Sequence, residues 1–371
     1  MSLQTSINSP TLLVNEAICK ANIARMAKKA KEHQLSLIPH FKTHQSLEIG
    51  NWYKEFGIDE ISVSSIQMAA YFAKQYWENI HIAFPFNPLE TDLLNTLAKD
   101  HSISVQLVNA PVAQILASQL TNSVGFFIEI DAGYGRAGVE VSDFGKIEDI
   151  MRIANRSDKL EFKGFYIHAG HTYHADQMGI HQIHGQTKAA LRMLKDKYCD
   201  EFPMLVTRSG DTPSCSIEND FTGIDEIGPG NFVFYDLTQA NIGSCDKSDI
   251  AIALAAPVVD IKKEKHEILV HSGGVHLAKD VLINPDGTKN YGEIVLLNEH
   301  GWTIPTKTSF LKSISQEHGV IKATDELLSK VEIGYVLGIL PVHSCMTADC
   351  MRIYFNLKGE KLDHLKGLKA N

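Results

Sequence analysis

The sequence has no long apolar run. No uninterrupted apolar stretch approaches the roughly 20 residues that a membrane-spanning helix needs. Residues 1–10 are polar and lack the charged start and apolar core of a secretory signal peptide. We therefore expect a cytoplasmic protein that does not bind a membrane.

Clusters of Lys and Arg are also missing. The formal net charge is −9 and the isoelectric point is near 6.0, so the chain offers no basic surface of the kind that nucleic acids need. The negative net charge and the lack of basic clusters exclude a nucleic-acid partner. We therefore expect the partner to be a small molecule.

Cysteines are too few and too scattered for a disulfide framework in a chain of 371 residues. We expect most of them to be reduced and buried, and one to be a ligand. The six are Cys19, Cys199, Cys215, Cys245, Cys345 and Cys350. Internal repeats, low-complexity tracts and long linkers are absent too, so the length predicts about two closely packed domains.

Eight short apolar runs are present, most of them separated by segments of helical character. Residues 65–77 are one such segment, in which Met68, Tyr71, Phe72 and Tyr76 can share a helix face. The runs are LSLIPHFK, DEISVSS, NIHIAFPF, SISVQLV, GFFIEIDAG, FKGFYIHAG, PMLVTRSG and IDEIGPGNFV. Apolar strands that alternate with helices predict a closed (β/α)8 barrel over residues 18–243. An open doubly wound sheet is the alternative.

After Gly243 the pattern changes to strands separated by turns, with few helical segments. This predicts a β-rich domain over residues 244–371, completed by residues 1–17. The apolar segment TLLV, residues 11–14, fits either the barrel or this β-rich domain.

Lys42 follows the first apolar run, in the segment PHFKTH. We expect it to be poorly solvated and to stand, with His44, at the end of the first barrel strand. An ordinary exposed loop lysine is the alternative, because most lysines are exposed.

Polar residues also follow the later strands of the predicted barrel, where the functional side chains of such barrels gather. Strand five is followed by Asp131 and Arg136. Strand six is followed by His168 and His171. Each residue has a structural alternative, such as a surface ion pair or a core histidine, but their recurrence at strand ends indicates a site.

Strands seven and eight end in hydroxyl groups and glycines, which form phosphate sites in many barrels. The residues are Ser209, Gly210, Thr212, Gly228, Gly230 and Asn231. A lysine able to form a Schiff base, opposite a phosphate cradle, is what pyridoxal phosphate requires. Glycines that serve only as turns are the alternative.

His343 and Cys345 lie two residues apart after an apolar strand, so an extended chain would place both side chains on one face. Imidazole plus thiolate suits zinc, and two ligands leave open positions for water and substrate. Asp349 or Cys350 could add a ligand. Coincidence is the alternative for so short a spacing.

The motifs PHFKTH, DAGYGRAGV, HAGH, RSGDTP, GPGNFVFYD and SQEHGV, in this order, resemble the D-threonine aldolase and D-serine dehydratase family. The resemblance covers residues 11–354. It implies a pyridoxal-phosphate enzyme of the alanine racemase fold type, a homodimer, and a divalent metal held near the C-terminus. The H-x-C pair resembles the dehydratase branch, where the threonine aldolase branch has H-x-D.

By this resemblance Lys42 binds the cofactor, Arg136 contacts the pyridoxal ring, and Tyr166 and His171 lie near it. Thr212, Gly228 and Asn231 lie near the phosphate. Asp211 departs from the pattern, because a carboxylate beside a phosphate is repulsive. Glu317 and His318 belong to the resemblance without a derived role; a partner of the metal and a loop-stabilising pair are equally open.

The resemblance implies a lyase that dehydrates and deaminates a D-β-hydroxy amino acid such as D-serine or D-threo-3-hydroxyaspartate, with Lys42 as the base. A metal-dependent aldolase with His44 or His171 as its base is the main alternative. A racemase and a non-catalytic pyridoxal-phosphate carrier are further ones. The carrier proteins resemble only the barrel, and no residue here identifies the second base of a racemase.

Overall fold

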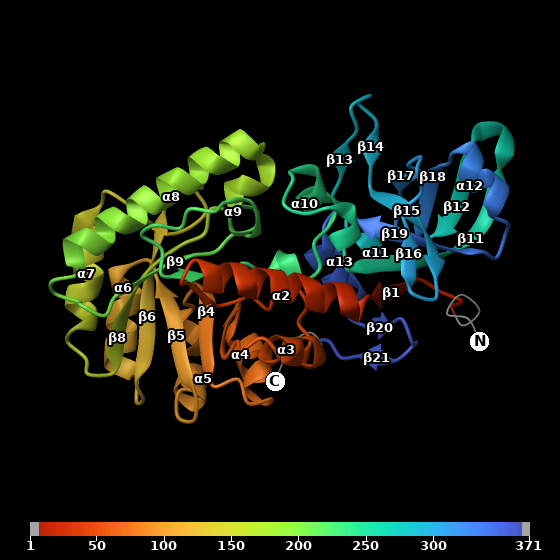
Figure 1. Cartoon of the computed structure of the whole chain (residues 1–371). Coiled ribbons are helices and arrows are strands. Elements are labelled where there is room, and N and C mark those ends of the chain that lie inside the picture. Colours follow the sequence, from red (N-terminus) through yellow and green to blue (C-terminus); the bar gives the residue numbers. More distant parts are fainter. Residues whose placement is uncertain (1–6, 366–371) are drawn as a thin grey trace. The chain divides into compact units, whose positions relative to one another are not determined.

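The computed structural model describes residues 7–365. These fall into two compact units: residues 24–232 form one, and residues 7–23 together with 233–365 form the other. The predicted domains, 18–243 and 244–371 with 1–17, remain predictions, and their ends at 1–6 and 366–371 lie outside the described residues. Figure 1 shows the elements of each unit along the chain.

The unit of residues 24–232 is built on a parallel sheet in which every predicted apolar run supplies a strand. In sheet order the strands are β2 (Ser36–Leu37), β10 (Glu226–Ile227), β9 (Val206–Ser209), β8 (Leu160–Ile167), β6 (Val124–Asp131), β5 (Ser102–Leu107), β4 (Asn79–Pro85) and β3 (Glu60–Val63). A parallel bridge between His40 and Ser62 joins the two ends of this order. The predicted (β/α)8 barrel is thereby confirmed.

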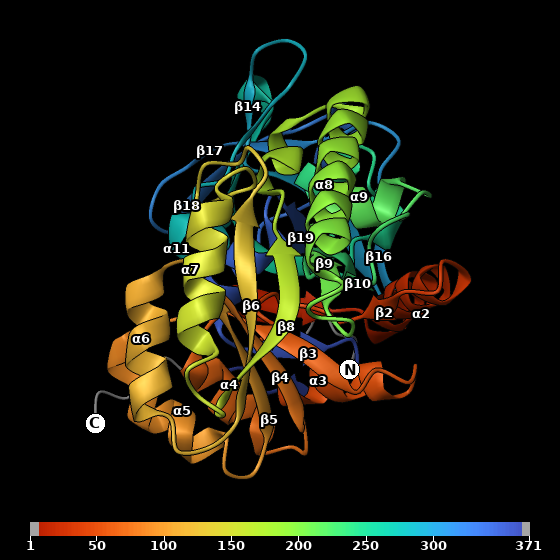
Figure 2. The ribbon, with the colours of Figure 1, turned by 90° about the vertical axis from the view of Figure 1, so that its left-hand side faces the viewer.

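Helices follow the barrel strands and cover the outer face of the sheet, as Figure 2 shows for α6, α7 and α8 beside β6 and β8. They are α3 (Leu47–Lys54), α4 (Ile66–Ala73), α5 (Thr91–Leu97), α6 (Ala110–Gln119), α7 (Phe144–Ala154), α8 (Gln177–Tyr198) and α9 (Thr212–Ile217). Helix α2 (Glu16–Glu32) runs from one unit into the other.

Helix α4 is shorter than the sequence predicts. Ser65 caps it by accepting a hydrogen bond from the backbone N–H of Met68, as expected of an N-cap serine. The helix ends at Ala73, and Tyr76 adopts a left-handed backbone conformation with φ of 62°. Met68 and Phe72 are buried, whereas Tyr76 is 83% exposed, so the prediction that Tyr76 shares their face is wrong.

The other unit holds a sheet of ten mostly antiparallel strands. Its strands include β11 (Ile252–Lys262), β12 (Glu267–His271), β15 (Gly292–Asn298), β17 (Phe310–Ile314), β18 (His318–Lys322), β19 (Val336–Pro341) and β20 (Tyr354–Asn356). Short helices α10 (Leu237–Asn241), α11 (Gly274–Leu277), α12 (Asp325–Lys330) and α13 (Ser344–Met351) follow or separate the strands. The predicted β-rich texture is confirmed.

Residues 11–14 form strand β1 (Thr11–Val14), which pairs antiparallel with β11 and parallel with β20. The alternative left open by the sequence is thus decided in favour of the β-rich unit. Leu12, Leu13 and Val14 are fully buried there.

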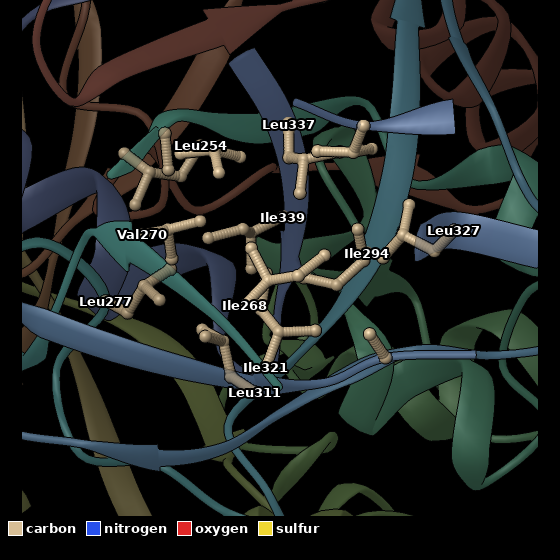
Figure 3. Close-up of a cluster of buried hydrophobic side chains, with 14 residues drawn as sticks. Leu254, Ile268, Val270, Leu277, Ile294, Leu311, Ile321, Leu327, Leu337 and Ile339 are labelled. Atoms are coloured by element: carbon tan, nitrogen blue, oxygen red, sulfur yellow. The ribbon is translucent and has the colours of Figure 1, made fainter. Parts of the chain in front are cut away.

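The core of the β-rich unit is aliphatic. Figure 3 shows side chains from β11, β12, β15 and β19 meeting in one cluster, among them Leu254, Ile268, Ile294 and Ile339. Removal of this apolar surface from water is the main source of stability for such a sheet.

Within residues 7–365 we find no helix with the length and hydrophobicity of a membrane span.

Candidate functional site

Lys42 stands in the turn that follows strand β2. Its neighbours Phe41 and Thr43 are fully buried, while Lys42 itself is exposed. The prediction of a poorly solvated lysine is therefore wrong for this structure. The backbone N–H of Lys42 donates to Nδ1 of His40 at 3.3 Å.

Two buried histidines lie near Lys42 and Arg136. Burial lowers the pKa of His40 well below its usual range, and the charges of Lys42 and Arg136 add to the effect. Burial also lowers the pKa of His168 to about 3, again helped by Lys42 and Arg136. Both imidazoles are therefore neutral, and the positive charges that act on them are those of Lys42 and Arg136. Such a site favours an anionic ligand.

The ring of His168 has a fixed orientation. Nδ1 of His168 donates a hydrogen bond to the carbonyl oxygen of Gly210, which follows strand β9. An acceptor at Nδ1 leaves Nε2 as the nitrogen without a proton in the neutral ring.

Arg136 is carried by a tight loop after strand β6. The carboxylate of Asp131 accepts hydrogen bonds from the backbone N–H groups of Gly133, Tyr134 and Gly135, at 2.9–3.0 Å. These bonds fix the loop from which the exposed guanidinium extends, with Cζ of Arg136 5.2 Å from the centroid of the Tyr134 ring. Asp131 thus has a role in building the loop.

Tyr134 also orders His171. Their rings are stacked, with centroids 5.7 Å apart and an interplanar angle of 21°. Nδ1 of His171 is buried and has no hydrogen-bond partner among the described residues. The structure therefore brings together Arg136, Tyr134 and His171 beyond the ends of β6 and β8.

Tyr166 and Glu129 are neighbours in adjacent strands β8 and β6. Burial raises the pKa of Tyr166, so the phenol keeps its proton. Burial also raises the pKa of Glu129 to about 7, although the charge of Arg136 opposes this shift. Within the described chain, Oε2 of Glu129 is buried without a hydrogen-bond partner.

The predicted phosphate residues come together at the ends of β9 and β10. The backbone N–H of Asn231 donates to Oγ1 of Thr212 at 3.1 Å, and that of Gly228 donates to the carbonyl oxygen of Ser209 at 2.8 Å. At Gly210 a Cβ atom would lie 2.6 Å from the phenolic oxygen of Tyr166. At Gly230 it would lie 2.7 Å from the carbonyl oxygen of His40. Only glycine permits these close approaches.

Asp211 turns its carboxylate toward the start of helix α9. Oδ1 accepts from the backbone N–H of Ser214 at 2.8 Å and from the hydroxyl of Thr172 at 3.1 Å. Burial raises its pKa. An N-cap role explains why an acidic residue is present in the predicted phosphate cradle.

His44 lies in an aromatic cluster. Its ring is fully buried, 4.5 Å from the ring centroid of Phe41 and stacked on Tyr53 at 5.8 Å. Nδ1 accepts a hydrogen bond from the backbone N–H of Ser46 at 3.1 Å. This environment favours a packing role, and a catalytic role for His44 stays a prediction.

His343 and Cys345 lie in the β-rich unit, where helix α13 begins. Nδ1 of His343 is 3.3 Å from Oδ1 of Asp280. Burial lowers the pKa of His343, but the hydrogen bonds with Asp280 and Cys345 outweigh burial and raise it to about 11. The surroundings of this ring therefore favour a positive charge. We find no group of three or more His, Cys, Asp or Glu side chains arranged for a metal in residues 7–365.

The other residues predicted near this pair include Cys350, Glu317 and His318, and the charge of Asp280 also acts on Cys350. Cys350 is exposed at the end of α13. Glu317 pairs with His271 at 3.7 Å, and His318 lies opposite His271 in the β12–β18 register. The loop-stabilising interpretation of Glu317 and His318 is the one that these contacts favour.

The sequence analysis missed four polar residues at these sites. They are His40 and Glu129 in the barrel unit, and Asp236 and Asp280 in the β-rich unit. His40 carried a signal, since it lies in the same segment, PHFKTH, as Lys42. Asp280 carried none, because it lies 63 residues from His343 in sequence.

Comparisons with known proteins agree with this fold. The family model described as "Alanine racemase, N-terminal domain" matches residues 14–236. The model described as "Putative serine dehydratase domain" matches residues 251–357.

Curated relatives match almost the whole chain. D-serine dehydratase from Dictyostelium discoideum is 27% identical over 92% of this chain and 91% of the relative. D-threo-3-hydroxyaspartate dehydratase from Delftia sp. is 24% identical over 92% of each. 3-Hydroxy-D-aspartate aldolase from Paracoccus denitrificans is 22% identical over 97% of this chain and 91% of the relative.

A solved structure also matches. It is a variant of D-threo-3-hydroxyaspartate dehydratase with one cysteine replaced by alanine, described as metal-free. It superposes with a TM-score of 0.90 at 23% identity, over 98% of this chain and 99% of the other. At this identity the likeness establishes the fold. The chain therefore belongs to the family that has the alanine racemase N-terminal domain, and its C-terminal part matches the model described as "Putative serine dehydratase domain".

Proposed function

We propose that this protein is a lyase that depends on pyridoxal phosphate and a divalent metal, and that it dehydrates a D-configured β-hydroxy amino acid. The products are a 2-oxo acid and ammonia. D-Serine and D-threo-3-hydroxyaspartate, which the names of the dehydratase relatives specify, are the proposed substrates. We further propose that the enzyme is a homodimer, as the family resemblance implies, and that it is cytoplasmic, as the sequence analysis predicts.

The observation that carries the choice of a dehydratase is the pair His343 and Cys345. An imidazole and a thiol two residues apart suit zinc, and the carboxylate of Asp280 beside His343 adds negative charge to the site. Asp280 contacts Nδ1 of His343, which leaves Nε2 for the metal. A zinc ion held by these two residues would act as a Lewis acid toward the β-hydroxyl oxygen of the substrate.

The barrel unit fits pyridoxal phosphate. Lys42 would supply an amine for the aldehyde of the cofactor, and Arg136 would supply a cation for the oxygen on the cofactor's ring. The loops at 209–212 and 228–231 would form a cradle for the phosphate. When bound, the cofactor accepts the electrons that the substrate releases as its Cα proton leaves.

The protein's own groups would then bind, orient and move protons. Nζ of Lys42 is the base that we propose takes the Cα proton. His168 stays neutral because its pKa is depressed to about 3 by burial, so it does not compete for that proton. Tyr134 stacks on His171 and holds it in place beside Arg136.

An aldolase is the second candidate, because an aldolase is among the relatives that match nearly the whole chain. It would need a base for the β-hydroxyl proton. His171 is the better choice for this role, since its Nδ1 has no partner among the described residues whereas His44 is enclosed by aromatic rings.

The test is the product formed from D-serine, D-threonine and D-threo-3-hydroxyaspartate by the purified enzyme with pyridoxal phosphate. A 2-oxo acid plus ammonia, lost with a chelator and restored by zinc, is the expected result. Glycine plus an aldehyde or glyoxylate would instead identify an aldolase. Products that are unaffected by chelation would refute the role of the metal.

A further inference from the structure

Ser344 stands between the two proposed metal ligands, and both of its donors bind one carboxylate. The backbone N–H and the hydroxyl of Ser344 lie 3.0 and 3.2 Å from Oδ2 of Asp236. Asp236 is 1% exposed and Ser344 is fully buried. A buried carboxylate with two charge-assisted bonds to one residue holds that residue firmly.

The residue on the other side of His343 is held by the same segment. The hydroxyl of Thr238 donates to the carbonyl oxygen of Val342 at 2.8 Å, and the backbone N–H of Thr238 donates to it at 3.2 Å. Asp236 and Thr238 therefore form hydrogen bonds with the residues immediately after and immediately before His343.

The segment that holds these residues, 236–238, forms the capped start of helix α10. Oδ1 of Asp236 accepts from the backbone N–H of Gln239 at 2.9 Å, which caps helix α10. One carboxylate thus uses one oxygen to start a helix and the other to hold the residue between the two ligands.

From this arrangement we propose that Asp236 and Thr238, which we name the 236–238 clamp, are positioning residues for the metal. By fixing the backbone at Val342 and Ser344, the clamp sets the relative placement of His343 and Cys345, while Asp280 orients the imidazole. The inference rests on the proposed function, because it takes His343 and Cys345 as the metal ligands. Partners behind the ligands typically change metal affinity 10- to 100-fold.

The alternative is that Asp236 only caps helix α10. Asp236→Asn separates the two roles. The amide oxygen can still accept from Gln239, but the amide N–H₂ then faces the two donors of Ser344. Ser344→Ala removes one bond to the clamp, and Thr238→Val removes the hydroxyl bond to Val342.

Thr324→Val is the matched control. Thr324 caps helix α12 in the same unit by accepting from the backbone N–H of Leu327 at 3.3 Å. Its loss costs a helix cap, and within residues 7–365 the hydrogen bonds of the Thr324 side chain go to Ser309 and Leu327, not to residues 342–344.

The experiment measures the zinc dissociation constant of the full-length enzyme by competition with a chromogenic chelator. Cobalt bound in place of zinc reports the cysteine ligand through its thiolate charge-transfer absorption. Thermal unfolding of each variant reports folding. We expect zinc binding about 10- to 100-fold weaker in Asp236→Asn, and a smaller loss in Ser344→Ala and Thr238→Val. The cobalt–thiolate band should be altered in Asp236→Asn, and Thr324→Val should bind zinc as the wild type does.

Wild-type zinc affinity in folded Asp236→Asn and Ser344→Ala would overturn the proposal, as would an equal loss in Thr324→Val. If Asp236→Asn does not fold, Ser344→Ala and Thr238→Val decide by the same criterion. Unchanged zinc binding in both His343→Ala and Cys345→Ala would refute the proposed metal site itself, and the clamp with it.

Discussion

Arg208 donates from Nε to Oε2 of Glu226 at 2.6 Å, across the adjacent strands β9 and β10. Its Nη2 donates to Oε1 of Glu60, on β3, at 2.7 Å. The guanidinium is 1% exposed and lies over the ring of Phe127. One buried cation therefore ties three barrel strands together.

Replacing Arg208 by methionine should destabilise the protein by about 3 kcal/mol, because it leaves two partly buried carboxylates without their counterion. Denaturant unfolding measures this change. Arg152→Ala is the control, since its ion pair with Asp149 has both partners more than half exposed and should contribute less than about 1 kcal/mol. Equal losses in the two variants would contradict the role of burial.

Glu129 should make stability depend on pH. Burial raises its pKa to about 7 in the folded protein, above the usual value for glutamate. The folded state therefore binds more protons than the unfolded state between these values, and stability falls as pH rises toward 7. Glu129→Gln should remove this part of the dependence. The free energy of unfolding, measured at pH 5, 6, 7 and 8, should therefore rise in the variant relative to the wild type as the pH increases. A constant difference at all four values would disprove the shift.

Lys42→Ala should abolish the visible absorbance of covalently bound pyridoxal phosphate and reduce the dehydratase rate by several orders of magnitude, because no other amine is assigned to the cofactor. Absorbance spectroscopy of the dialysed protein measures the first effect. Lys28→Ala is the control, since Lys28 pairs with Glu32 on the exposed side of α2. Retained absorbance in Lys42→Ala would show that the assignment is wrong.

Cys345→Ala should lower both the zinc content and the rate of ammonia release, whereas Cys350→Ala should change neither. Both thiols belong to helix α13, but Cys350 is exposed. Elemental analysis and an ammonia assay give the two readings. An equal effect of both substitutions would indicate a general disturbance of the helix and would argue against a ligand role for Cys345.

The barrel could be predicted because each strand carries its own signal. The runs that contain Ile61, Ile82 and Val105 are apolar, are bounded by turns and alternate with helices, and all three residues are buried. The residues after the first run and after the last four runs then indicated the site, because parallel strands end at the same edge of a barrel.

Long-range pairings could not be predicted in this way. Nothing near residues 11–14 indicates strand β11 as their partner, and nothing near His343 indicates Asp280 or Asp236. The solvation of Lys42 was predicted wrongly for a related reason. The apolar run before Lys42 made the segment look internal, although the exposure of one side chain depends on the turn that the backbone makes there.

Strand β1 has a consequence for the order in which the protein is made. Leu12, Leu13 and Val14 leave the ribosome early, but their partner strands are residues 252–262 and 354–356. Residues 24–232 hold all strands of the barrel and can fold while synthesis continues. The strand that carries these three apolar side chains is synthesised before residues 252–262 and 354–356, so it has no partner strand until those residues have been made. A chain that is truncated after the barrel strands would keep this apolar strand unpaired. Chaperones and proteases could then recognise the truncated chain by its unpaired strand.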